Sequence, residues 1–111
     1  MITYQEAKRA AEKHFNLPDE VTLMASEMES AWLFGTRMTL PNGHAMSVPG
    51  VGTYAVRKDT GEGIRINGTA YAIAKSDGDR DGYGRQLAAK FGMTFPEFVT
   101  AMSEKSESVP A

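Results

Sequence analysis

Cysteine is absent from this chain of 111 residues. Its absence excludes disulfides, thiolate metal sites and cysteine nucleophiles, and it fits a reducing compartment. No apolar run approaches the roughly 18 residues that a membrane-spanning helix needs. The opening segment, MITYQEAKRAAEKHF, contains no apolar signal core. We therefore expect a cytoplasmic protein.

Catalytic motifs are scarce as well. The two histidines, His14 and His44, fall on separate predicted elements, and neither has an evident partner. There is no G-x-S-x-G elbow, and the glycines of GVGTYAV lead into a strand pattern rather than into the helix that a phosphate-binding loop requires. We therefore predict a protein without catalytic activity and without a cofactor.

Charge of one sign is not concentrated enough to suggest a nucleic-acid partner. The formal net charge is −2, whereas nucleic-acid binding depends on basic side chains that neutralise phosphates. The charges are nevertheless unevenly placed. Residues 1–30 hold three basic and six acidic side chains, and residues 31–66 hold four basic and two acidic ones. Such a separation can steer a charged partner, although solvated faces also produce it.

Two capping boxes mark helix starts near the ends of the chain. Thr3 and Glu6 form a T-x-x-E box, and a series of small apolar residues follows at helical spacing until Asn16. Thr94 and Glu97 form a second box before the apolar residues of a last helix. These signals predict one helix at the beginning of the chain and one or two at its end.

The middle of the chain predicts antiparallel strands. Trp32 and Phe34 alternate with Leu33, and turn sequences at residues 41–43 and 59–63 separate apolar runs. Residues 69–75 fit either another strand or a short helix. Hairpins without strand–helix alternation indicate the α+β class. We expect an N-terminal helix packed on a sheet of four to five antiparallel strands, followed by a C-terminal helical hairpin. Residues 1–104 would form one domain, and residues 105–111 a flexible polar tail.

The stretch SDGDRDGYGRQ, residues 76–86, resembles the start of an EF-hand calcium loop because Asp77, Asp79 and Asp81 alternate before Gly82. The twelfth position, however, holds Ala88 where a bidentate glutamate completes the calcium site, and no entering helix is evident. Three interpretations stay open: a weak calcium-binding module, a solvated turn in which one aspartate caps the next helix, and an acidic patch for a basic partner.

Residues 85–102, RQLAAKFGMTFPEFVTAM, have the spacing of a helix-turn-helix. The second helix would carry Glu97 toward DNA and has no arginine or lysine for phosphate contacts. A DNA-binding regulator is therefore an alternative, and a helical hairpin that packs on the sheet explains the same pattern.

Three segments of the chain resemble the YrhB-like domain family of small bacterial immunity-type proteins. They are MITYQEAKRAAEKHF, AWLFG with its W-x-F pair Trp32 and Phe34, and PGVGTYAVRKDTGEG. The matching positions of the last segment are Gly50, Gly52, Val56, Thr60, Gly61 and Glu62. The resemblance covers roughly the first two thirds of the chain. The family has Gly-Pro where this chain has Gly52-Thr53, and the acidic stretch and the helical hairpin lie outside the match.

This resemblance implies a protein that binds and neutralises a cognate bacterial toxin. Such binding commonly relies on complementary charge at the active site of the toxin. The clustering of acid around one tyrosine suggests the site: Asp77, Asp79 and Asp81 would bind the partner, with Tyr83 as an aromatic anchor. Asp59 and Glu62, in the predicted turn, complete the set of partner-binding residues. The oligomeric state is left open.

Overall fold

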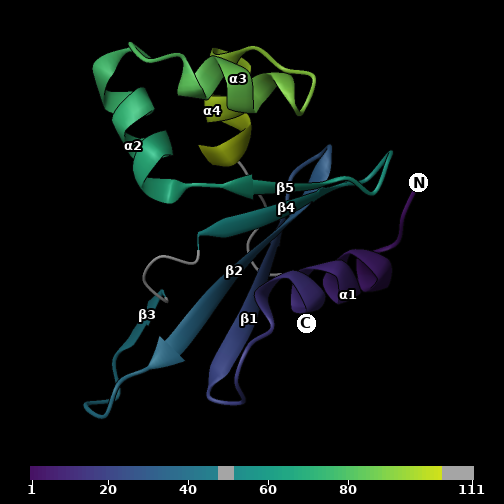
Figure 1. Cartoon of the computed structure of the whole chain (residues 1–111), viewed down its shortest axis with the longest axis vertical. Coiled ribbons are helices and arrows are strands. Elements are labelled where there is room, and N and C mark those ends of the chain that lie inside the picture. The colour runs from purple at the N-terminus through teal and green to yellow at the C-terminus, as the bar shows by residue number, and fades with distance from the viewer. Residues whose placement is uncertain (48–51, 104–111) are drawn as a thin grey trace.

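A computed structural model describes residues 1–47 and 52–103 of the chain. Figure 1 shows an N-terminal helix, an antiparallel sheet and a group of C-terminal helices, which confirms the α+β class. The elements in chain order are α1 (Tyr4–Phe15), β1 (Val21–Glu27), β2 (Ala31–Thr39), β3 (Ala45–Ser47), β4 (Thr53–Arg57), β5 (Gly63–Ile66), α2 (Gly68–Asp77), α3 (Tyr83–Ala89) and α4 (Phe95–Ser103). The predicted tail at residues 105–111 lies outside the described residues.

In the described residues, the sheet has five strands and all its pairings are antiparallel. Its main path runs β1-β2-β4-β5, and β3 also pairs with β2. One edge of β2 pairs with β1 along the whole length of β1, from Val21 opposite Met38 to Glu27 opposite Trp32. The other edge is shared, because its first half pairs with β4 and its last residues pair with β3. Strand β2 is therefore the centre of the sheet.

Helices cover both faces of this sheet. Alternate residues of β2 point to opposite faces: Phe34 packs with Ala7 and Ala11 of α1, and Leu33 packs with the C-terminal helices. Trp32 packs on the α1 side with Phe34, as the alternation predicted. Alanines on the buried face of α1 allow the helix to lie close to the strands. The result is a sheet between two helical layers of unequal size.

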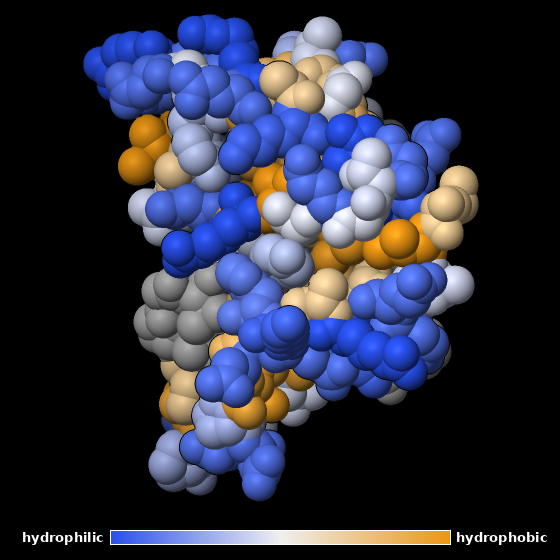
Figure 2. All heavy atoms as spheres, turned by 45° about the vertical axis from the view of Figure 1, so that its right-hand side comes forward, coloured by the Kyte–Doolittle hydropathy of each residue, from blue (hydrophilic) through white to orange (hydrophobic). Residues whose placement is uncertain are grey.

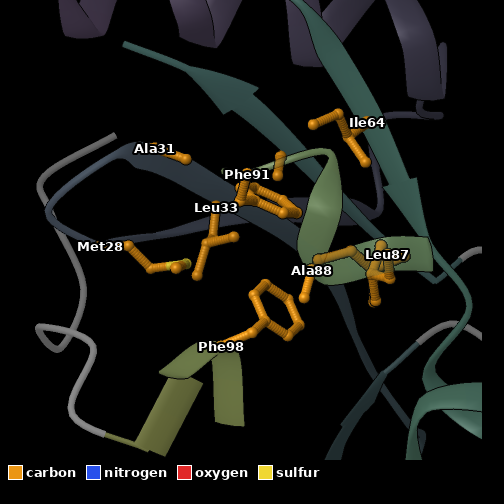
Figure 3. Packing of buried hydrophobic residues seen from close by; sticks show 10 residues of the cluster. Met28, Ala31, Leu33, Ile64, Leu87, Ala88, Phe91 and Phe98 are labelled. Carbon is orange, nitrogen blue, oxygen red and sulfur yellow. The ribbon is translucent and has the colours of Figure 1, made fainter. Parts of the chain in front are cut away.

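The larger layer contains α2, α3 and α4 as far as the chain is described, up to Ser103. Residues 69–75, which the sequence left open between strand and helix, belong to α2, so the C-terminal part has one helix more than the predicted hairpin. Figure 3 shows Phe91 beside Leu33 of β2, with Phe98 of α4 and Ala88 of α3 next to them, and Leu87 of α3 belongs to the same buried cluster. The rings of Phe91 and Phe98 lie 5.0 Å apart. These contacts fix α3 and α4 on the sheet.

The predicted caps and turns are present. The backbone N–H of Thr3 donates to Glu6 Oε1, and the N–H of Glu6 donates to Thr3 Oγ1, which completes the first capping box. The same reciprocal bonds join Thr94 and Glu97 before α4. Asn16 ends α1 in the left-handed conformation. The turns between β2 and β3 and between β4 and β5 fall at residues 40–44 and 58–62.

No helix in residues 1–47 and 52–103 has the length and apolarity needed to cross a membrane.

Candidate functional site

The acidic stretch forms the connection between α2 and α3. Asn67 caps α2 by accepting a hydrogen bond from the N–H of Ala70, and Gly78 ends the helix at φ +74°, a conformation that glycine adopts at little cost. A helix therefore does enter the acidic stretch, and the prediction that it lacks one is wrong. The four residues after Gly78 then lead to α3, which begins at Tyr83.

Asp79 is buried, with 4% of its surface exposed. Its Oδ1 accepts a hydrogen bond from the backbone N–H of Gly84 at 2.7 Å, and its Oδ2 accepts one from Arg85 at 2.9 Å. These are free amides in the first turn of α3, which has no cap bond from Gly82 itself. One aspartate therefore caps the next helix, as one of the three interpretations stated. The sequence predicted that Asp79 binds a partner. In the structure its carboxylate lies inside the protein and is not part of the surface that a partner could contact.

Asp77 and Asp81 have different surroundings. Asp77 is half-buried, and its Oδ1 accepts hydrogen bonds from the N–H of Asp79 at 3.1 Å and of Arg80 at 3.4 Å. Its Oδ2 lies 3.4 Å from the exposed guanidinium of Arg80. Asp81 is exposed, and no other residue in the described part of the chain bonds to its carboxylate. The outward-facing acid of the connection is therefore Asp81, whereas both carboxylate oxygens of Asp77 already have partners within the connection.

The arrangement does not resemble an occupied EF-hand. Within the described ranges, no group of three or more His, Cys, Asp or Glu side chains is placed to hold a metal ion. Both oxygens of Asp79 already accept backbone hydrogen bonds, and Ala88, at the position of the bidentate ligand, is buried in the core. Asp77 and Asp79 instead support the turn itself by accepting backbone hydrogen bonds, and Gly78 and Gly82 adopt the left-handed conformation there.

A hollow of about 120 Å³ lies between α2 and this connection. It is lined by Ala70, Ile73, Ala74, Asp77, Asp79, Asp81 and Tyr83. The hydroxyl of Tyr83 accepts a hydrogen bond from the N–H of Asn67 at 3.0 Å, which holds the half-buried ring across the start of α2. Ile73 is 52% exposed. The hollow therefore combines an apolar wall with carboxylates.

The surface around the hollow is hydrophilic. Figure 2 shows blue residues gathered at the upper left of the molecule, the part where Figure 1 places α2 and the start of the α2–α3 connection, with an orange spot just below them. We call this region the α2–α3 surface and define it by Ile73, Asp77, Asp81 and Tyr83. Of the six residues predicted to bind a partner, three belong to it.

Asp59 and Glu62 lie elsewhere, in the turn between β4 and β5, at the opposite end of β5 from α2 (Figure 1). Asp59 binds the guanidinium of Arg57, with Nη2 at 2.6 Å from Oδ2, and this pair lowers the pKa of the Asp59 carboxyl. Arg57 also donates to the carbonyl of Lys90, so it ties the turn to the end of α3. The six predicted residues therefore do not form one continuous surface.

The sequence did not indicate Ala70, Ile73 or Ala74 as site residues. They lie with Asp77 along one side of α2, at the spacing of three to four residues that brings side chains together on a helix. This spacing identifies the residues as neighbours only if residues 69–75 are known to be helical. In a strand, consecutive side chains would point to opposite faces.

Trp32, one residue of the W-x-F pair on which the resemblance rests, is held by contacts within the fold. Its ring contacts Tyr4 of α1 edge-on at 5.1 Å, and the ammonium group of Lys58 lies 4.5 Å from its centre. Lys58 also pairs with Glu27. These contacts fasten α1 and the β4–β5 hairpin to the start of β2, and they explain the aromatic residues without reference to a partner.

The chain matches no family model, no curated protein and no solved structure. The resemblance to the YrhB-like family therefore stays a prediction.

Proposed function

We propose that the protein binds a basic protein partner through the α2–α3 surface and neutralises it, as an immunity-type protein does with a cognate toxin. The partner would present an arginine or lysine whose aliphatic stem packs on Ile73 and Tyr83. Its charged head would meet Asp81 and would replace the exposed Arg80 guanidinium at Asp77. A nuclease toxin offers such a surface, because its substrate cleft is basic.

The observation that carries the proposal is the composition of the hollow. Ile73 is a large apolar side chain exposed beside two carboxylates and an anchored tyrosine. Aromatic and apolar anchors bordered by charge are typical of the energetically important part of protein interfaces. No comparable observation supports the helix-turn-helix alternative. Phe98 of α4 is fully buried on the sheet, and Glu97 takes part in the capping box of the same helix.

The test is capture of partners by the tagged protein from its native host, followed by mass spectrometry of what stays bound at moderate salt. Two double variants carry the same change of charge. Asp77→Asn/Asp81→Asn alters the α2–α3 surface, and Asp59→Asn/Glu62→Gln alters the β4–β5 turn.

We expect one stoichiometric partner with a basic binding face, retained by the turn variant and lost or weakened by roughly tenfold or more with the α2–α3 variant, since charge pairs at interface centres are worth on the order of 1.5–7 kcal/mol. Equal retention by both variants, or loss only with the turn variant, would show that the α2–α3 surface is not the binding site. Recovery of DNA in place of a protein would favour the regulator instead.

A further inference from the structure

Strand β1 is an edge strand whose outward hydrogen-bonding groups can be identified. At the β1–β2 turn, the N–H of Met28 donates to the carbonyl of Ala31 at 2.9 Å, so these two residues form a hydrogen-bonded pair. Such pairs alternate along an antiparallel ladder. The register then directs the N–H and C=O groups of Leu23, Ala25 and Glu27 away from β2. In the part of the chain that the structure describes, β1 pairs with β2 alone.

Acidic side chains flank this free edge at both ends. Asp19 and Glu20 precede the strand, and Glu29 follows it, and all three are exposed. Figure 1 places β1 at the opposite edge of the sheet from β5, which leads into α2 and the α2–α3 connection. These three acidic residues are therefore separate from the α2–α3 surface. The edge therefore offers backbone hydrogen bonds between two negatively charged ends.

A hollow of about 370 Å³ adjoins the beginning of the strand on the α1 side. Val21 and Leu23 form apolar parts of its lining, and Glu12 and Asp19 contribute carboxylates. A residue placed opposite Leu23 on an added strand would point its side chain to the same face as Leu23. A long basic side chain at that position would lie in this hollow, with its stem on Leu23 and its charge near Glu12 and Asp19.

A second copy of the chain fits this edge poorly. In the symmetric antiparallel pairing that aligns all of β1 with itself, Val21 lies opposite Glu27 of the other copy, and Asp19 lies opposite Glu29 at both ends. Like charges directly opposite each other destabilise a strand pair, and acidic residues at an edge discourage self-association.

We propose that β1 binds an extended segment of a protein partner, which adds a strand to the sheet and carries basic side chains at its ends. Main-chain hydrogen bonds to Leu23, Ala25 and Glu27 hold the segment, and the acidic ends of β1 together with the hollow select lysine or arginine. The inference concerns a second surface and does not depend on the α2–α3 surface being a binding site.

Three synthetic peptides test this inference. The first alternates valine and threonine and has lysines at both ends, the second has glutamates in their place, and the third is the lysine peptide with alternate backbone nitrogens methylated. The readout is the chemical shift and hydrogen-exchange rate of each backbone amide of the isotope-labelled full chain. With the lysine peptide alone, we expect exchange at Leu23, Ala25 and Glu27 to slow by roughly tenfold or more, as newly formed ladder hydrogen bonds require.

Two variants separate this surface from the other. Asp19→Lys/Glu29→Lys should exchange the preference, so that the glutamate peptide binds and the lysine peptide does not. Asp77→Asn/Asp81→Asn should leave binding of the lysine peptide unchanged.

The inference is overturned if the lysine peptide perturbs residues outside β1 only, or if both charged peptides bind equally. It is also overturned if the amides of Leu23, Ala25 and Glu27 are already protected in the dilute free protein, because the chain itself would then cover the edge.

Discussion

Asp79 Oδ1 accepts a hydrogen bond from the backbone N–H of Gly84 at 2.7 Å, inside the protein and across the acidic connection. The carboxylate compensates for the absence of a side-chain cap at Gly82, where α3 begins. Asp79 itself has a φ of +61°, which aspartate tolerates better than most residues. Asp79 is therefore the least accessible aspartate of the connection, and the geometry of the α2–α3 surface depends on it.

Asp79→Ala should destabilise the fold by about 2 kcal/mol, since it removes a helix cap and leaves two amides of α3 without their partner. Asp81→Ala is the matched control, because no other residue in the described ranges bonds to that carboxylate, and it should leave the free energy of unfolding nearly unchanged. Urea denaturation followed by circular dichroism measures both. Equal stability of the two variants would contradict the capping role.

Gly84 lets α3 and α4 approach each other. A Cβ atom at this position would lie 2.5 Å from the ring of Phe95, inside the contact distance of any real side chain. Gly84→Ala should therefore cost about 1–3 kcal/mol through overpacking. Gly68→Ala, in the first turn of α2, has no atom within 4 Å of its new methyl group and should be neutral or slightly stabilising. Thermal unfolding of the two variants distinguishes packing from helix propensity.

Phe95→Leu offers a second check on the Gly84 contact. If the clash with the ring is the cause, the smaller side chain should recover part of the loss in the Gly84→Ala background, and a double-mutant cycle measures the coupling. Additive losses would show that the two residues act independently.

The fold was predictable where local chemistry determines the element. The capping boxes at Thr3 and Thr94 and the turn residues of both hairpins act on their own neighbours, so they can be recognised without knowledge of the rest of the chain. The alternation of Trp32, Leu33 and Phe34 likewise predicted which side chain reaches which face, because the period of a strand is two residues.

The candidate site was predictable only in part, because it depends on contacts across α2. Residues 69–75 lack a clear period, and their helical state follows from the Asn67 cap and from packing of Tyr71 against Phe95 and Phe98. The burial of Asp79 likewise depends on where α3 begins. Spacing alone presented the three aspartates as equivalent, whereas the fold places one inside and leaves Asp81 outside.

Gly63 lies beneath the ring of Tyr54 on the α1 side of the sheet. A Cβ atom at Gly63 would meet the Tyr54 hydroxyl at 1.6 Å, so Gly63→Ala must displace that ring. The ring of Tyr54 also stacks on His14 at 4.0 Å, with 12° between the planes. We expect a loss of about 1 kcal/mol together with changed ring-proton shifts of His14. The control is Gly35→Ala, another substitution in a strand, where an added Cβ atom has no other atom within 4 Å. It should cause neither the loss of stability nor the change in the ring-proton shifts of His14.

The carboxylates of the two capping boxes contribute, beside Asp59, to the sensitivity of the folded state to acid. Hydrogen bonds from Thr3 lower the pKa of Glu6 below its usual 4.5, and hydrogen bonds from Thr94 lower the pKa of Glu97 in the same way. The unfolded chain therefore binds these protons more readily than the folded one. Each group contributes stability that is complete above about pH 4.5 and is lost as the pH falls through the lowered pKa of the folded state.

Glu6→Gln/Glu97→Gln should therefore flatten the acid side of the stability curve, since glutamine can still accept the capping hydrogen bonds but does not titrate. The free energy of unfolding of the variant should fall less steeply than that of the unaltered protein between roughly pH 5 and pH 2. Urea titrations at a series of pH values measure the two slopes. Glu62→Gln removes one exposed carboxylate outside the caps and serves as the control. If the double variant kept the original slope, the acid sensitivity would have to arise from carboxylates other than those of the two capping boxes.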